Sequence, residues 1–149
     1  MKRIRLVPPV YFFLALALSV ALDRWLPGIR LVGPPWHWLS LACLAPALAL
    51  GGPAARSLVG RGTTLDPFGE PSALVMEGPF RYSRNPLYLS LAFLLLGAAI
   101  FLGSLTPFLV VPAFMAVVTV RFIRREEAAL AAGFGEQYRE YCRRVRRWL

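Results

Sequence analysis

Hydrophobic residues in this chain lie in long runs, and polar or basic segments separate the runs. The longest run without a charged residue covers residues 85–120, between Arg84 and Arg121. As one helix, these 36 residues would be about 54 Å long, whereas a hydrocarbon core is only about 30 Å thick. The run therefore predicts a hairpin of two membrane spans rather than one straight span.

The break in this hairpin is predicted near its middle, where residues that end one helix and begin the next are clustered. These residues are Gly103, Ser104, Thr106 and Pro107. We expect spans at about 86–102 and 107–120, and Pro86 suits a first helical turn. A hairpin returns both of its ends to one membrane face, so the arginine-rich segment before it should meet the acidic segment after it.

Two shorter apolar runs precede the hairpin and predict spans at about 8–22 and 36–55. Pro46 lies inside the second run and should kink its helix, and the sequence Gly-Gly-Pro at 51–53 should mark the point where that helix frays. Residues 56–84 then form a long segment rich in glycine and proline. Loops of this size are usually functional or disordered, and the apolar residues at 74–76 favour an ordered loop that covers the site.

The first span has an alternative interpretation as a cleaved signal peptide. A basic start, a short apolar core and the small-x-small sequence Ser19-Val20-Ala21 all fit that interpretation. Cleavage would leave three spans and spoil the distribution of basic residues along the chain. We therefore expect the first span to be retained.

Basic residues are distributed unequally over the connections between the runs. Fifteen of the 17 lysines and arginines lie before the first span, in 51–84 or after residue 120, and two lie in 23–35. This asymmetry predicts that both termini are cytoplasmic. The formal net charge of +9 is then a signal of topology and of contact with anionic membrane lipids, rather than of nucleic-acid binding.

The overall composition agrees with this topology. The chain is 57% hydrophobic, with a mean hydropathy of +0.55, which is too apolar for an ordinary soluble domain. We expect an all-α polytopic membrane protein, with residues 1–149 in one domain, in a bacterial inner membrane. Four spans should be followed by a cytoplasmic helical cap over the functional site.

The segment after the hairpin, 121–149, is predicted to form that cap. Helical sequence at 121–132 is followed by a joint at Gly133-x-Gly135 and a second helix at 136–149. One apolar face recurs at helical spacing, and its members are Phe134, Tyr138, Tyr141, Val145 and Trp148. This face fits a helix at the membrane interface or, equally, a helix packed on the protein's own cytoplasmic surface.

Few side chains suggest chemistry outside the ends of the hairpin. The chain has a single histidine, His37, which lies between two tryptophans. A metal site needs several ligands, so none is expected here. Cys43 and Cys142 are interpreted as packing residues. Phosphate-binding motifs and a nucleophile–base pair are also absent from the sequence. What remains is the charge at the two ends of the hairpin.

At these ends, Arg81 and Arg84 supply donors that match carboxylates or phosphates, and Glu126 and Glu127 supply acceptors. Neighbouring helical residues point about 100° apart, so only one of the two glutamates should face a given pocket. The alternative is an ordinary ion pair at the membrane surface.

The order of residues around the hairpin favours a functional site. Before the hairpin, the chain reads Gly78-Pro79-Phe80-x-x-x-Arg84-Asn85-Pro86-x-Tyr88. After it, the chain reads Glu126-Glu127-x-x-Leu130-x-x-x-Phe134-Gly135-x-x-Tyr138-x-x-Tyr141-x-x-x-Val145. This pattern resembles the integral-membrane methyltransferases that include isoprenylcysteine carboxyl methyltransferase and the phospholipid N-methyltransferases. The resemblance covers roughly residues 62–148, which is over half of the chain.

The resemblance implies a site for S-adenosylmethionine, with S-adenosylhomocysteine as product, enclosed by the last two spans and the C-terminal segment. The positions that match cofactor-binding residues of the superfamily are Leu74, Val75, Phe80, Arg84, Asn85, Pro86, Tyr88 and Glu126 or Glu127. Arg84 is also a candidate catalytic residue. Arg121 is a second one, carried over weakly, because its spacing from the glutamates differs from that of the family's substrate-binding arginine.

The resemblance leaves the methyl acceptor open. Prenylcysteine enzymes have histidine and tyrosine where this chain has Asn85 and Phe80, which is more typical of the broader bacterial and phospholipid-type members. We expect a lipophilic or amphipathic acceptor that enters from the bilayer, methylated on oxygen, nitrogen or sulfur. No feature of the sequence requires a protein partner.

Two other functions are compatible with a small helical membrane protein. One is an NADPH-dependent membrane reductase, because integral-membrane sterol reductases have a similar C-terminal architecture. The other is a transporter or non-enzymatic membrane protein. Proton-coupled transporters usually carry an acidic residue within their spans, and the four predicted spans contain none.

Overall fold

The fold is known from a computed structural model, which describes residues 7–62 and 73–149. The helices are α1 (Pro8–Trp25), the 3-10 helix η1 (Trp36–Cys43), α2 (Leu44–Gly60), the 3-10 helix η2 (Gly78–Arg81), α3 (Pro86–Leu102), α4 (Leu105–Val118), the π-helical turn η3 (Thr119–Ile123) and α5 (Arg124–Arg144). Within the described ranges there is no β-strand element, so the prediction of an all-α fold is confirmed. The basic residues before position 7, and residues 63–72 of the predicted loop, lie outside the described residues.

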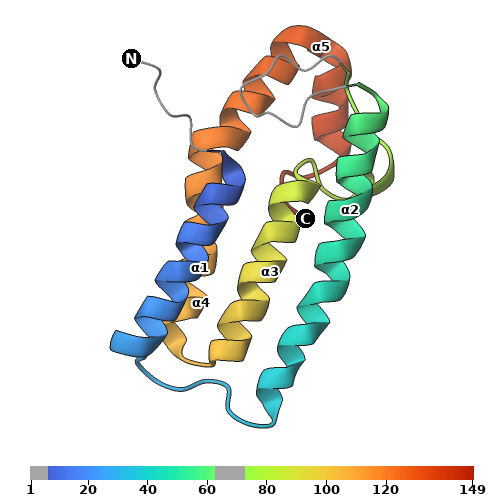
Figure 1. The fold of residues 1–149 in the computed structure, drawn as a ribbon. Helices are drawn as coiled ribbons and strands as arrows, with labels where there is room; N and C mark the ends of the chain where they lie inside the picture. The colour runs from blue at the N-terminus through green and yellow to red at the C-terminus, as the bar shows by residue number, and fades with distance from the viewer. Residues whose placement is uncertain (1–6, 63–72) are drawn as a thin grey trace.

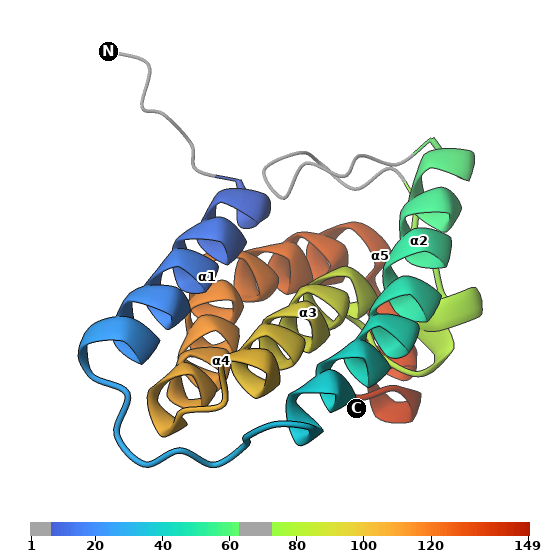
Figure 2. The same ribbon diagram turned by 60° about the horizontal axis from the view of Figure 1, so that its bottom comes forward.

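The helices α1, α2, α3 and α4 run side by side (Figures 1 and 2). α3 lies in the middle of the bundle and contacts α1, α2 and α4, and α1 packs along α4. The largest buried cluster joins α3 to α4 and to the start of the C-terminal segment; its members are Tyr88, Leu95, Val110, Phe114, Val118, Phe122 and Ile123.

Large apolar side chains also cover the outside of the bundle. They include Phe13, Leu14 and Leu18 on α1, Leu48 on α2 and Leu109 on α4, each more than half exposed. Water would not favour such a surface, whereas acyl chains would cover it without a free-energy penalty. The outer surface is therefore that expected of a membrane protein.

Among residues 7–62 and 73–149, two helical stretches are long and apolar enough to cross a membrane. They are Trp36–Gly60, which contains an 18-residue window with a mean hydropathy of 1.5, and Leu105–Arg144, which contains one with a mean hydropathy of 1.9. The second has 40 residues, more than a bilayer requires, and its charged residues all follow Val120. We therefore take its spanning part to end at Val120. Pro86–Leu102 is a shorter apolar helix, and the prediction of four spans extends beyond these two candidates.

The predicted break is confirmed as the turn of a helical hairpin, in which α4 begins at Leu105 rather than at Pro107. α3 ends at Gly103, which has a φ of +84°, and Ser104 is the N-cap of α4. The connection at 26–35 docks on this turn: the amides of Leu31 and Val32 both donate to the Gly103 carbonyl, over 2.7 and 3.0 Å. The Ser104 hydroxyl donates to Asp23 over 2.6 Å. The connections at 26–35 and 103–104 are thus tied together at one end of the bundle, as the up-and-down order of the helices requires.

We expect Gly103→Ala to destabilise the protein. The positive φ costs a residue with a Cβ about 1–2 kcal/mol, and a Cβ here would lie 2.1 Å from the Val32 carbonyl oxygen, so the docked connection would also have to move. Gly133→Ala is the matched control, because a Cβ there meets nothing within 4 Å. Thermal unfolding in detergent should show a lower midpoint for Gly103→Ala alone. Equal midpoints would contradict this explanation of the turn.

The structure corrects the prediction for the second span. The helix does not fray at 51–53 but continues to Gly60, with Pro53 inside it. Pro46 lies in the first turn of α2, directly after the 3-10 helix η1, and a kink at Pro46 stays a prediction. Gly51 has a packing role instead, because a Cβ at this position would lie 2.8 Å from the Ser90 hydroxyl of α3. The first span likewise extends to Trp25 rather than ending at Leu22.

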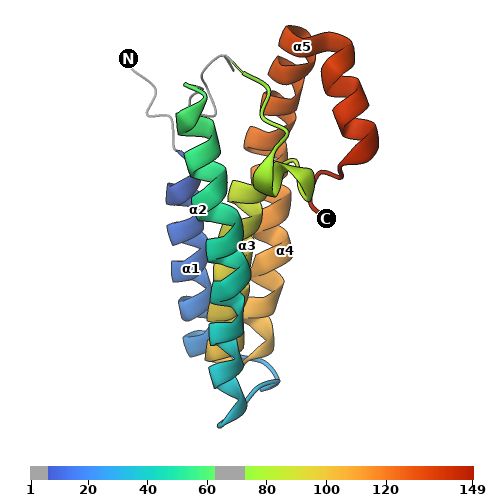
Figure 3. The ribbon, with the colours of Figure 1, turned by 90° about the vertical axis from the view of Figure 1, so that its right-hand side faces the viewer.

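The C-terminal segment folds back on itself, as Figure 3 shows. Gly135 supplies the bend, with a φ of +49° and a ψ of −119° that only glycine adopts readily. The predicted joint is therefore confirmed. The second helix ends at Arg144 rather than at Leu149, and the last residues are not helical.

The apolar face of the C-terminal helix packs on the protein itself. Tyr138 and Tyr141 are buried, and Trp148 packs against the main core cluster. Of the two alternatives for this face, the structure supports packing on the protein's own surface.

Candidate functional site

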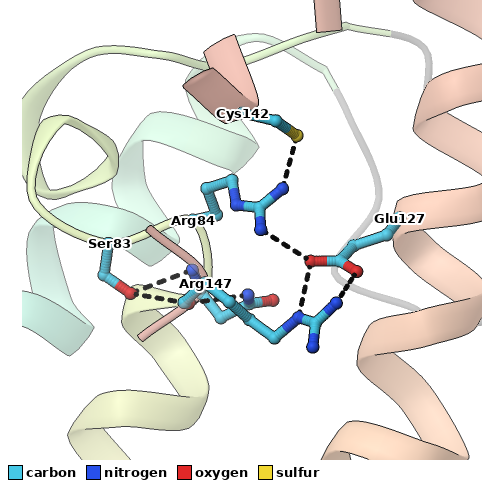
Figure 4. Close-up of polar contacts among 6 residues, drawn as sticks. Ser83, Arg84, Glu127, Cys142 and Arg147 are labelled. Atoms are coloured by element: carbon cyan, nitrogen blue, oxygen red, sulfur yellow. Dashed lines mark hydrogen bonds and ion pairs between the residues drawn. The ribbon is translucent and has the colours of Figure 1, made fainter. Parts of the chain in front are cut away.

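The two ends of the hairpin meet, together with the C-terminal segment (Figure 4). Four segments contribute: the residues just before α3 together with its first turn, the first turn of α5, the last turn of α5, and the residues that follow α5. Each position has a local cause. Pro86 begins α3 at its first turn, the π-helical turn η3 leads into α5, and the bend at Gly135 turns the chain back toward α3.

Glu127 lies between two arginines at the centre of this group. Arg147 binds it in a bidentate manner, with Nε donating to Oε1 over 2.9 Å and Nη2 donating to Oε2 over 2.7 Å. Nη2 of Arg84 lies 3.4 Å from Oε1. The side chains of Arg84 and Glu127 are only 15% and 16% exposed, so this charge network is shielded from water much more than an ordinary surface pair.

Arg84 has donors in excess of its partners. One terminal nitrogen, Nη1, donates to the Cys142 sulfur, and the other faces Glu127. Its Nε is buried and has no hydrogen-bond partner in the described structure. A buried donor without a partner is unusual in a native protein, so Arg84 Nε has capacity for an acceptor such as a water or a ligand oxygen.

The C-terminal segment is held against the residues before α3 by backbone hydrogen bonds. The Arg84 amide donates to the Arg146 carbonyl over 3.0 Å, and Asn85 Nδ2 donates to the Arg147 carbonyl over 2.9 Å. The Ser83 hydroxyl also donates to the Arg147 carbonyl, over 3.3 Å. Asn85 therefore binds the C-terminal segment through its amide, and it is buried.

Glu126 points to a different neighbour from Glu127. The Tyr88 hydroxyl donates to its Oε1 over 2.5 Å, and the Tyr88 ring stacks near Phe122 with centroids 6.4 Å apart. Among the described residues Glu126 makes no ion pair. Burial raises the pKa of Glu126 above its usual range, the neighbouring Glu127 adds to this, and the bond from Tyr88 opposes it. It is thus a shielded carboxylate that lacks a cationic partner.

Only one of the two glutamates was expected to face the pocket. Both are shielded, but they face different partners: Glu126 faces α3, and Glu127 faces the two arginines. The roughly 100° between helical neighbours accounts for this division.

A small apolar cluster adjoins the charged group. Val75 and Phe80 are buried together with Ala54 of α2. The Tyr141 hydroxyl donates to the Phe80 carbonyl over 2.6 Å, which ties this loop to the C-terminal helix. Leu74 is half-buried beside Val75, and Pro86 is buried. The apolar residues at 74–76 thus anchor the described part of the loop, as predicted.

The structure therefore brings together most of the residues that the sequence singled out. Arg84, Asn85, Tyr88, Glu126 and Glu127 lie in one connected group. Arg121 is exposed on η3 and takes no part in the contacts of that group.

Three residues of the group were not predicted. The Arg147 side chain binds Glu127, and the Cys142 sulfur accepts from Arg84. The Ser83 hydroxyl donates to the Arg147 carbonyl. Arg147 is one of eight basic residues after position 120, and nothing in the sequence distinguishes it from the others. The helical periodicity that ends at Trp148 was the one available signal that the last residues return to the protein.

The group has the chemistry of a site for a zwitterion. A shielded carboxylate can bind an ammonium group, a guanidinium with a free donor can bind a carboxylate, and aromatic rings stand beside both.

Comparison with known proteins places this arrangement in context. The family model described as phospholipid methyltransferase matches residues 35–137, which is more than half of the chain. An uncharacterized protein of Haemophilus influenzae is 43% identical over 63 residues, which are 42% of this chain and 100% of that protein. No solved structure matches the chain.

Proposed function

This chain belongs to the phospholipid methyltransferase family, part of the superfamily of membrane methyltransferases that includes isoprenylcysteine carboxyl methyltransferase, and we propose that it transfers a methyl group from S-adenosylmethionine to a lipophilic or amphipathic small molecule. The observation that carries the proposal is the presence in one group of a shielded carboxylate without a cation, Glu126, and a guanidinium with a donor that has no partner in the described structure, Arg84. The two residues are linked through Glu127, which follows Glu126 in the chain and faces Arg84.

These residues fit the charged groups of S-adenosylmethionine. Glu126 is the partner we assign to the ammonium group, because it is the glutamate whose charge no arginine neutralises within the described structure. Arg84 Nε is the donor we assign to the carboxylate. The faces of Tyr88 and Phe80 suit the sulfonium and the adenine, because aromatic rings stabilise cations and stack on bases. Leu74, Val75, Asn85 and Pro86 line or support this site in the proposal.

The residues of the chain act by alignment and by exclusion of water. S-adenosylmethionine, when bound, supplies an electrophilic methyl group. Arg84 and Glu126 would orient it from two sides, and the C-terminal segment would cover the site. Arg121 stays a candidate for contact with the acceptor: it is exposed just after the spanning part of the fourth helix, where an amphipathic acceptor would present its polar group.

The membrane topology is part of the proposal. We propose four spans, with α1 and α3 crossing together with the two longer candidates, and with both termini and the candidate site on the cytoplasmic side of a bacterial inner membrane. The apolar outer surface and the unequal distribution of basic residues support this arrangement. The acceptor would then reach the site from the bilayer.

The cofactor is tested by calorimetry on the detergent-purified protein. We expect binding of S-adenosylmethionine and of S-adenosylhomocysteine, and none of NADPH. Binding of NADPH without S-adenosylmethionine would instead indicate a membrane reductase. Binding of neither would support a non-enzymatic membrane protein.

The acceptor class is tested by isotope labelling. Cells with and without the gene are fed methionine labelled in its methyl group, and their lipid extracts are compared by mass spectrometry. We expect a labelled lipid-soluble product that depends on the gene. If the label appears only in water-soluble compounds, the proposed class of acceptor is wrong.

A further inference from the structure

The last four residues of the chain bring one arginine to the centre of the candidate site. Arg146 and Arg147 accept hydrogen bonds from the residues before α3 through their carbonyl oxygens, and Trp148 packs against the core cluster. The backbone around Arg147 is therefore fixed on both sides. Its side chain is delivered to Glu127, where it forms a bidentate pair.

This pair affects the carboxylate next to it. Glu126 and Glu127 are adjacent and both shielded, so the negative charge of Glu127 disfavours ionisation of Glu126. Arg147 is the closer of the two cations at Glu127, with contacts of 2.7 and 2.9 Å, whereas Arg84 lies 3.4 Å away. Without Arg147, the charge of Glu127 would be balanced by Arg84 alone.

We propose that Arg147 is a positioning residue of the cofactor site: it neutralises Glu127, so that Glu126 stays available for a cationic group and Arg84 for an anionic one. The inference rests on the proposed binding of S-adenosylmethionine. It assigns a role to a residue that touches neither the methyl group nor the acceptor in our scheme. Arg147 acts through Glu127 and Arg84.

Several charged and titratable groups surround the pair and bear on its test. Tyr88 faces Glu126 from α3, and Glu127 lies beside it on α5. Arg84 approaches Glu127 from the residues before α3. Tyr138 and Cys142, from the second half of α5, face Arg84 and Glu127. Arg147 differs from all of these in adding a positive charge that no other residue of the C-terminal segment brings to Glu127.

The first measurement needs no cofactor. The Glu126 side chain is titrated by carbon-13 NMR in the ligand-free protein, wild type and Arg147→Ala. We expect the pKa of Glu126 to rise further in the variant, because more of the Glu127 charge is left unbalanced. Arg146→Ala is the matched control: the same charge is removed from the next residue, whose side chain is exposed. An equal pKa of Glu126 in all three proteins overturns the inference.

The second measurement is the affinity for S-adenosylmethionine as a function of pH. An ammonium group needs ionised Glu126, so binding is lost as the pH falls through the pKa of Glu126. In Arg147→Ala we expect about tenfold weaker binding near neutral pH, because a smaller fraction of Glu126 is ionised and Arg84 must balance Glu127 alone. The acidic limb of the binding curve should also move to higher pH. Arg147→Lys keeps the charge but not the bidentate geometry, so its affinity for S-adenosylmethionine should lie between those of the wild type and Arg147→Ala. Arg146→Ala should match the wild type.

A variant that only unfolds would also bind weakly, so a double substitution is included. Once Glu127→Gln has removed the charge that Arg147 balances, adding Arg147→Ala should weaken binding no further. An additional loss in the double variant would show a merely structural role and overturn the inference.

Tighter binding by Arg147→Ala would also overturn the inference, since Arg147 would then be a competitor of the cofactor. A wild-type protein that does not bind S-adenosylmethionine would overturn the proposed function itself, and the NMR titration would still decide the coupling between Arg147 and Glu126.

Discussion

Replacing Glu126 by glutamine is expected to weaken the binding of S-adenosylmethionine by between about tenfold and about a hundredfold, while the fold is retained. A hydrogen bond to a charged group contributes roughly 1.5–3 kcal/mol, which corresponds to that range. Glutamine keeps the size of the side chain and can still accept the bond from Tyr88, so the packing should change little. Removal of a shielded negative charge should, if anything, stabilise the ligand-free protein.

The control for this prediction is Glu140→Gln. Glu140 lies on the same helix but is exposed, and it pairs with Arg144 at the surface. Calorimetry should give wild-type affinity for Glu140→Gln, and circular dichroism should give similar thermal unfolding for all proteins. A strong loss in Glu127→Gln with wild-type affinity in Glu126→Gln would reverse our assignment of the two glutamates. Wild-type affinity in both would show that the carboxylates do not bind the cofactor.

Replacing Arg84 by lysine is expected to weaken S-adenosylmethionine binding more than tenfold. Lysine keeps the positive charge but loses the planar guanidinium, which here divides its donors between Glu127, Cys142 and the free Nε position. A single ammonium group does not reproduce that geometry. The fold should survive because Arg147 still neutralises Glu127.

Arg81→Lys is the matched control, three residues earlier on the exposed part of η2. It applies the same chemical change without touching the group of contacts. The affinity for S-adenosylmethionine should then fall in Arg84→Lys and in Arg84→Ala but not in Arg81→Lys. Equal losses at Arg81 and Arg84 would indicate a general dependence on surface charge rather than a specific contact.

Features of the fold that follow from the local order of residues could be predicted from the sequence, and features that depend on contacts between distant residues could not. The hairpin was predictable because its length exceeds one bilayer and its break is occupied by glycine, serine and proline. The meeting of Arg84 with the glutamates followed from the hairpin, since antiparallel neighbours return to one end. The extent of α2 was not predictable, because Gly51 and Pro53 are residues that usually break helices. The role of Gly51 is to let Ser90 of α3 pack closely, and that contact is visible only in the tertiary structure.

The sequence by itself determined the apolar runs, the hairpin and the list of residues at its two ends. It did so because burial in a bilayer requires long uncharged helices, and because turns require particular residues. Only the tertiary structure decided how the charges are shared. The division of Glu126 and Glu127 between Tyr88 and the arginines depends on the orientation of α5 after the π-helical turn. The choice of Arg147 depends on a return of the chain that brings one arginine among many to a shielded carboxylate. Such pairing is a property of distance and burial, and neither is encoded in the local order of residues.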